Sequence, residues 1–306
     1  MAAEDGNITR YTYRGEVHER IPREATHITV AEDVTFVRAW ALAGHRNIIE
    51  VICHDRVDKI GDQAFWCCPN LRRVIIPGVK IAAHRAFHCC KALTDIECGK
   101  LEIIGQSAFK LCESLESISL PSARIVDVNA FSHSALTGVK FSNKLERIGS
   151  LAFIDCPSLE RITLPLKDGL ITADNIFMGC DKLTRVDLVE EAALQETAAA
   201  LQLDVWENDM NEEIDSINRI LLNARAGCVT GGWFDDGEKA QAIRRWIESF
   251  IGKINRYKAE HRRVLNEAAA TLQLVLPPDI ATKNIVPFLE LPGLDLLRLS
   301  SAWGRA

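Results

Sequence analysis

Hydrophobic positions recur with a fixed period over the first part of the chain. The dipeptide Ala-Phe is the clearest landmark, and its Phe residues are spaced by 22 positions each time. They are Phe65, Phe87, Phe109, Phe131 and Phe153. Leu42 precedes this series by 23 residues and Phe177 follows it by 24. Such a period predicts a solenoid, because each repeat buries its apolar side only by stacking on its neighbours.

Two further motifs travel with each Phe. About six residues after it, an alternation of apolar and polar residues such as Leu71, Val74 and Ile76 predicts a short half-buried strand. About five residues before it stands Ile-Gly, as in Ile60-Gly61, or a variant such as Ile81-Ala82. The Gly predicts a bend in which a Cβ atom would crowd the chain. In one repeat the strand motif starts one residue early, at Leu136.

A column of small residues stands three positions after each landmark. It contains Cys68, Cys90, Cys112, Ser134, Cys156 and Cys180. We therefore interpret these cysteines as buried structural residues, and Cys53 and Cys98 as small apolar residues of the strands. Cys67, Cys89 and Cys228 are left without a place in the pattern. Ten free thiols are the favoured state, with a disulfide or a metal site as the alternatives.

These motifs carry a family resemblance. A period of 22–24 residues with Ile-Gly, Ala-Phe-x-x-Cys and Leu-x-x-Ile-x-Leu-Pro resembles the BspA-type leucine-rich repeats over about residues 25–190. With its C-terminal helical region, the chain is similar to such repeat proteins of unicellular algae. The resemblance implies a solenoid used for protein recognition or adhesion, and it implies no catalytic residues.

The expected fold is an α/β leucine-rich-repeat solenoid, with parallel strands on the concave side and short helical turns on the convex side. An N-terminal β-hairpin, residues 8–13 and 16–20 around Arg14-Gly15, is expected to cap it. Apolar residues recur every three or four positions in 190–222 and 238–276, which predicts a C-terminal helical hairpin. The expected domains are 1–24 (hairpin cap), 25–189 (solenoid), 190–276 (helical hairpin) and 277–306 (tail).

The end of the repeats needs a cover of its own. We expect the first helix to begin as the C-terminal cap, with Leu194, Ala198 and Leu201 buried against the last repeat. At the other end, Tyr11, Tyr13 and Trp40 offer bulk over the open edge.

Composition narrows the function. The net charge of −6 gives no basic footprint for nucleic acid, and the chain contains none of the common nucleotide, hydrolase or metalloprotease motifs. We expect no enzyme activity, no cofactor and no small-molecule substrate. His84 and His88 are four residues apart and, with Cys89, offer only a weak case for a metal site. The acidic N-terminus and the lack of a long apolar stretch predict an intracellular, cytoplasmic protein without a transmembrane segment.

The candidate site is the exposed face of the strands. Residues on either side of each buried strand residue point outward, and neighbouring strands align them in rows. Ile52 and Ile75 are apolar where solvated residues are expected, so they either contact a partner or lie under the N-terminal hairpin. The candidate partner-binding residues are Glu50, Ile52, Arg73, Ile75, Asp95, Glu97, Lys140, Arg161 and Arg185.

The leading hypothesis is a non-catalytic protein-protein interaction scaffold that binds an unknown protein through this face, through the helical tail, or through both. A cell-surface adhesin is one alternative. Another is nucleic-acid or anionic-lipid binding through the basic face of the second tail helix, which includes Arg244, Arg245, Lys253, Arg262 and Arg263. That face is equally compatible with pairing to the acidic first helix.

Overall fold

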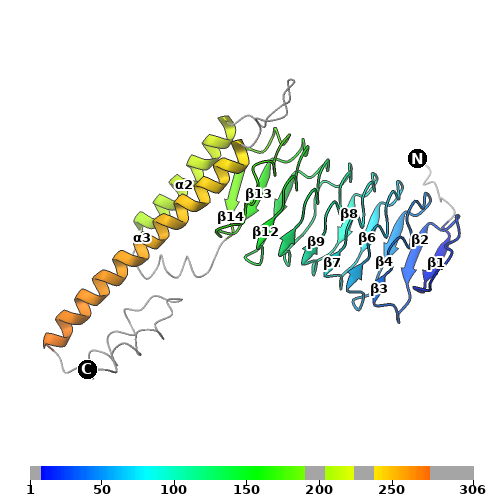
Figure 1. The fold of residues 1–306 in the computed structure, drawn as a ribbon, viewed down its shortest axis with the longest axis horizontal. Helices are drawn as coiled ribbons and strands as arrows, with labels where there is room; N and C mark the ends of the chain where they lie inside the picture. The colour runs from blue at the N-terminus through cyan, green and yellow to red at the C-terminus, as the bar shows by residue number, and fades with distance from the viewer. Residues whose placement is uncertain (1–7, 190–203, 224–237, 276–306) are drawn as a thin grey trace, which may run out of the picture. The chain divides into compact units, whose positions relative to one another are not determined.

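The computed structural model describes residues 8–189, 204–223 and 238–275. The first range is a solenoid of about seven turns, whose short strands pair in parallel from one turn to the next. Figure 1 shows these strands following one another along the solenoid. The fold class expected from the sequence is confirmed.

The strands of successive turns form a main sheet that is divided in two. The first sheet contains β1 (Arg10–Tyr13), β2 (His27–Val30), β4 (Glu50–Ile52), β6 (Arg73–Ile75) and β8 (Asp95–Glu97). The third sheet continues it with β11 (Gly138–Lys140), β13 (Arg161–Leu164) and β14 (Arg185–Leu188). Between these two sheets, residues 117–119 form no strand, and Ser119 makes a single parallel bridge to Lys140 of β11. The break falls one turn before β11, which belongs to the repeat whose strand motif starts one residue early.

The Ile-Gly motifs form a second sheet of two-residue strands. It contains β3 (Phe36–Val37), β5 (Lys59–Ile60), β7 (Ile81–Ala82), β9 (Ile103–Ile104), β10 (Ile125–Val126) and β12 (Arg147–Ile148). The expected crowding at Gly is confirmed, because a Cβ on Gly61 would lie 2.7 Å from the Val37 carbonyl oxygen. The alignment of one variant was wrong: Ile60 pairs with Ala82, so Ala82-Ala83 takes the place of Ile-Gly in that turn.

The remaining side of each turn bends tightly without forming a helix in residues 8–189, which corrects the expectation of short helical turns there. From Leu42 to Phe153, the residues two before and two after each landmark adopt positive φ, for example Arg85 at 53° and Cys89 at 63°. Their N–H groups, and that of the landmark, point to the next turn: Phe87 donates to the Ala108 carbonyl at 2.8 Å. A third ladder of backbone hydrogen bonds therefore joins the turns.

The core is a column of stacked phenylalanines. Consecutive rings from Phe65 to Phe153 are nearly parallel, with centroids 5.1–5.4 Å apart, and Phe177 stacks on Phe153 at 5.8 Å. All of these rings are buried. Each ring thus fills the space between two turns, as the period predicts.

The N-terminus differs from the expected hairpin. β1 is the first parallel strand of the solenoid and pairs in register with β2, for example Tyr13 with Val30. Residues 14–20 form a loop instead of a second strand, because the Glu19 carboxylate accepts hydrogen bonds from the Arg14 and Glu16 N–H groups at 2.8 and 3.1 Å. These N–H groups are therefore engaged locally.

Two helices follow the repeats, α2 (Asp204–Asn223) and α3 (Glu238–Val275), which confirms the helical tail expected from the sequence. The described residues form two compact units: 8–189 with 214–223 and 238–247, and 204–213 with 248–275. The domain boundaries expected from the sequence stay a prediction. Leu194, Ala198, Leu201 and the tail 277–306 lie outside the described residues.

Within the first unit, the helices supply the cover for the last turn. Lys239 is only 3% exposed, and its ammonium donates to the carbonyls of Cys180, Asp181 and Leu183 at 2.7–3.1 Å. The Asn218 side chain accepts the Val186 N–H at 2.9 Å. Polar side chains of α2 and α3 thus satisfy backbone groups that no further repeat would pair.

Candidate partner-binding face

Outward-facing side chains of the first sheet form two rows. Strand register aligns Glu50, Arg73 and Asp95 in one row, and Ile52, Ile75 and Glu97 in the other. We call these positions, with Lys140, Arg161 and Arg185 of the third sheet, the strand face. The intervening residues Val51, Val74 and Ile96 are buried, so the alternation expected from the sequence is present.

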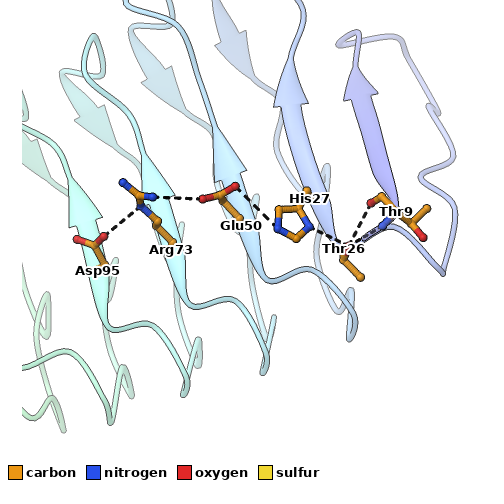
Figure 2. A network of polar contacts seen from close by, with 6 residues as sticks. All are labelled: Thr9, Thr26, His27, Glu50, Arg73 and Asp95. Atoms are coloured by element: carbon orange, nitrogen blue, oxygen red, sulfur yellow. Dashed lines mark hydrogen bonds and ion pairs between the residues drawn. The ribbon is translucent and has the colours of Figure 1, made fainter. Parts of the chain in front are cut away.

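The first row is a connected network of charges centred on Arg73 (Figure 2). Its guanidinium lies 3.6 Å from the Glu50 carboxylate, 3.2 Å from that of Asp95 and 2.9 Å from that of Glu97. The hydrogen bond to Glu97 and the nearby carboxylates raise the pKa of Arg73. Three carboxylates surround one guanidinium, so this half of the strand face has a negative excess.

The network continues toward the N-terminus. The second Glu50 oxygen lies 3.9 Å from the His27 Nε2 atom, and His27 Nδ1 shares a hydrogen bond of 2.9 Å with the Thr26 hydroxyl. Thr26 in turn accepts the Thr9 N–H at 3.0 Å. Sequence reasoning found the alternation of charge but missed these residues, because His27 and Thr26 belong to the degenerate first repeat. Each group therefore holds its neighbour in place.

Apolar side chains lie directly beside this network. Ile52 is 36% exposed and Ile75, its partner on the next strand, is half-buried. The alternative that an N-terminal hairpin covers them is wrong, because β1 lies at the edge of the same sheet as a parallel strand. Large apolar surface next to an ordered polar rim is typical of protein interfaces.

The other half of the strand face has the opposite charge. Lys140, Arg161 and Arg185 are all exposed on the third sheet. Asp187 is the one carboxylate at the outward positions of that sheet; it bonds to Arg161 and lies 3.3 Å from the Arg185 Nε atom. Three cationic side chains against one carboxylate leave a positive excess. The structure thus separates the candidate residues into an acidic and a basic half.

The cysteine column has a structural role that the sequence did not reveal. Each of its thiols donates to the carbonyl of the landmark residue one turn earlier: Cys90 to Phe65 at 3.1 Å and Cys112 to Phe87 at 3.3 Å. Burial raises the pKa of Cys68 to about 12 and that of Cys90 well above 9.0. The nine cysteines of the described ranges are free thiols.

Metal chemistry and membrane insertion receive no support from the described residues. These ranges contain no group of three or more His, Cys, Asp and Glu side chains arranged to hold a metal ion. Among the helices described, neither is long and apolar enough to cross a bilayer.

Several basic residues of α3 already have partners. Arg244 forms an ion pair of 2.6 Å with Asp174, and Lys253 bonds to Glu213 of α2. Arg263 lies 2.6 Å from Glu267, one helical turn further along α3. The Lys253–Glu213 pair agrees with the interpretation that the two helices neutralise each other.

Parallel strands, stacked landmark residues and a repeat of 22–24 residues define a leucine-rich-repeat solenoid. The sequence profile of the BspA-type leucine-rich-repeat region, in six copies, matches residues 22–125 and 102–218. The chain therefore belongs to the BspA-type leucine-rich-repeat family. No curated protein matched the sequence.

Several solved structures of bacterial repeat proteins are similar to part of the chain. A leucine-rich-repeat protein of Bacteroides ovatus is 20% identical, with a TM-score of 0.41; the match covers 56% of this chain and 53% of that one. A T. pallidum leucine-rich-repeat protein is 24% identical (TM-score 0.39), over 54% and 70% of the two chains. A leucine-rich cell-surface protein of Faecalibacterium prausnitzii is 22% identical (TM-score 0.36), over 60% and 64%. The match thus spans about half of the Bacteroides protein.

Proposed function

We propose that this protein is a non-catalytic scaffold that binds another protein through the strand face. The observation that carries the proposal is the position of Ile52, an exposed apolar side chain beside the network that holds Glu50, Arg73 and Glu97 in place. An interface needs an apolar anchor with an ordered polar rim, because burial supplies affinity and the charges supply orientation.

The charge of the strand face specifies the chemistry of the partner. The acidic half fits a basic segment with a large apolar residue for Ile52 and Ile75. The basic half, with Lys140, Arg161 and Arg185, fits an acidic segment. We therefore expect an elongated partner whose charges are arranged in the opposite order along the solenoid.

The test is to pan a phage-displayed random-peptide library on the full-length chain and on variants. We expect selected peptides to combine Arg or Lys with a large apolar residue. Their affinity for Ile52→Ser and Glu97→Lys should fall at least about tenfold, because an anchor or a rim charge of a hot spot is lost. Binders that ignore both substitutions would contradict the proposal.

Two matched controls keep the result specific. Val17→Ser removes an equally apolar side chain, 67% exposed, from the N-terminal loop. Glu32→Lys reverses a carboxylate that pairs with Arg56 as Glu97 pairs with Arg73. Neither control should change binding. If the selected peptides stop binding only in the Ile220→Ser variant, which alters an exposed apolar residue of α2, the interface would lie on the helical tail instead.

A further inference from the structure

Two cysteines differ from the others in their surroundings. Cys67 and Cys89 are half-exposed, whereas the other seven described cysteines are buried. Both lie two residues after a landmark Phe, with φ of 53° and 63°, so they are equivalent positions of consecutive turns. The sequence left them without a place in the repeat; the structure gives them one on the tight-turn side.

Backbone geometry does not explain a thiol at this position. The same column holds Gly44, Leu111, His133, Asp155 and Gly179, so the positive φ of this position is met by residues of several kinds and does not require a thiol. Nor do these thiols share the role of the buried column, whose members donate to a Phe carbonyl. The repeat needs no sulfur here, yet two consecutive turns provide it.

The two thiols lie within reach of each other. The Cys67 N–H donates to the His88 carbonyl at 2.8 Å, which sets the backbone of Cys67 beside that of Cys89. Equivalent residues of paired turns lie about 4.8 Å apart, within the range of about 4.4–6.8 Å between Cα atoms that a disulfide needs. The Cys89 side chain is also close enough to that of Cys67 to raise its pKa.

We propose that Cys67 and Cys89 are a redox modification site, which forms a reversible disulfide between two consecutive turns when a disulfide such as oxidised glutathione is present. The Cys89 thiolate attacks a glutathione sulfur, forms a mixed disulfide and releases one glutathione thiolate. The Cys67 thiolate then attacks the Cys89 sulfur and displaces the second glutathione. The protein loses two protons and two electrons, and oxidised glutathione becomes two glutathione thiols.

The surroundings favour this order of attack. Burial and the neighbouring Cys89 thiol raise the pKa of Cys67 to about 11, so Cys67 stays protonated to a higher pH than an ordinary thiol. The Lys91 ammonium, held at 2.7 Å by Glu113, lies close enough to Cys67 and Cys89 to interact with their charge. A nearby cation favours a thiolate.

The bridge would join two of the three turns that carry the acidic half of the strand face. Cys67 follows β4, which contains Ile52, and Cys89 follows β6, which contains Arg73. Closing a loop of 22 residues, from 67 to 89, restricts the unfolded chain and stabilises the folded one. Oxidation would therefore stiffen this end of the solenoid without adding a contact to the face itself.

The experiment compares full-length protein in oxidised glutathione and in reductant. We expect the oxidised protein to lose the mass of two hydrogens, to yield a Cys67–Cys89 crosslinked peptide, and to melt several degrees higher. In Cys67→Ser, the same treatment should leave one glutathione adduct on Cys89. Cys68→Ser is the matched control, since it removes the adjacent buried thiol and should still form the crosslink.

Three results would overturn the proposal. They are stable glutathione adducts on both cysteines of the unsubstituted protein, a disulfide-linked dimer in place of the internal crosslink, or thiols at 67 and 89 that stay unreacted while the chain is folded. Reversal by reductant is also required: an oxidised form that reductant does not return to the starting mass would exclude a reversible site.

Discussion

The thiol of Cys112 donates a hydrogen bond of 3.3 Å to the carbonyl oxygen of Phe87, one turn earlier in the solenoid. Both residues are fully buried. The Phe87 N–H already bonds to the following turn, through the Ala108 carbonyl. Both backbone groups of Phe87 are thus hydrogen-bonded to neighbouring turns, and each cysteine of the column bonds its own turn to the one before it.

Replacing this thiol tests its role as a donor. We expect Cys112→Ala to lower the free energy of unfolding by about 1–3 kcal/mol, because the buried Phe87 carbonyl loses its partner. Cys112→Ser should cost less, since a hydroxyl at this position can also donate to the carbonyl. Urea unfolding of the two variants measures the difference. Equal losses would show that volume, and not the hydrogen bond, selects cysteine here.

The buried thiols also predict a pH dependence. Burial raises the pKa of Cys53, Cys68 and Cys98 from 9.0 to about 12. Because the folded pKa lies above the unfolded one, this contribution to stability is complete below about pH 9 and is lost as the pH rises toward about 12. The free energy of unfolding, measured in urea from pH 7 to 11, should therefore fall at the alkaline end.

A variant separates the thiols from the other groups that titrate in this range. Cys68→Ser removes one ionisable group while keeping a hydroxyl donor at the same place. The alkaline fall should be shallower in this variant than in the unsubstituted protein. Identical slopes would mean that Cys68 does not contribute to the pH dependence.

The stacked core predicts a gradient of sensitivity along the solenoid. Phe109 stacks on Phe87 at 5.1 Å and on Phe131 at 5.4 Å, so Phe109→Ala leaves a cavity with rings on both sides. We expect a loss of about 3–5 kcal/mol. Phe177 stands at the end of this column and stacks on Phe153 at the longer distance of 5.8 Å, so its substitution should cost less. Chemical denaturation of both variants checks the order, which the reverse ranking would contradict.

The sequence was sufficient to predict those contacts that recur between equivalent residues of every pair of turns. A 22-residue spacing of Phe65, Phe87 and Phe109 leads directly to a column of rings, and the strand alternation leads to Glu50 beside Arg73. Both follow from periodicity, since equivalent residues of stacked turns must be neighbours. The separation of the strand face into two charged halves also needs only the register.

The structure of the two ends of the solenoid could not be predicted from the period, because the contacts there do not repeat. Arg14-Gly15 between residues 8–13 and 16–20 suggested a hairpin, yet the Glu19 carboxylate holds residues 14–16 in a loop and β1 joins the sheet in parallel. Nothing in the local pattern of Lys239 shows that its ammonium is buried against carbonyls 56 residues earlier in the chain. Such contacts join parts of the chain that no period relates.

The C-terminal cap yields the last prediction, which concerns where the chain can be cut. A fragment ending at Val189 loses both Asn218 and Lys239, so the Val186 N–H and the carbonyls of Cys180 and Leu183 lose their partners. We expect this fragment to aggregate or to melt earlier than the full chain. A fragment ending at Asn223 keeps Asn218 only, so its melting temperature should be intermediate, whereas a fragment ending at Ile247 should retain most of the stability.

The substitution Lys239→Met in the full chain tests the same cap without truncation. It keeps the apolar stem of the side chain but removes the donor, and it should lower the free energy of unfolding by at least about 2 kcal/mol. Circular dichroism, monodispersity and melting temperature decide among these outcomes. A 1–189 fragment as soluble and stable as the full chain, together with a neutral Lys239→Met, would show that the helices do not cap the repeats.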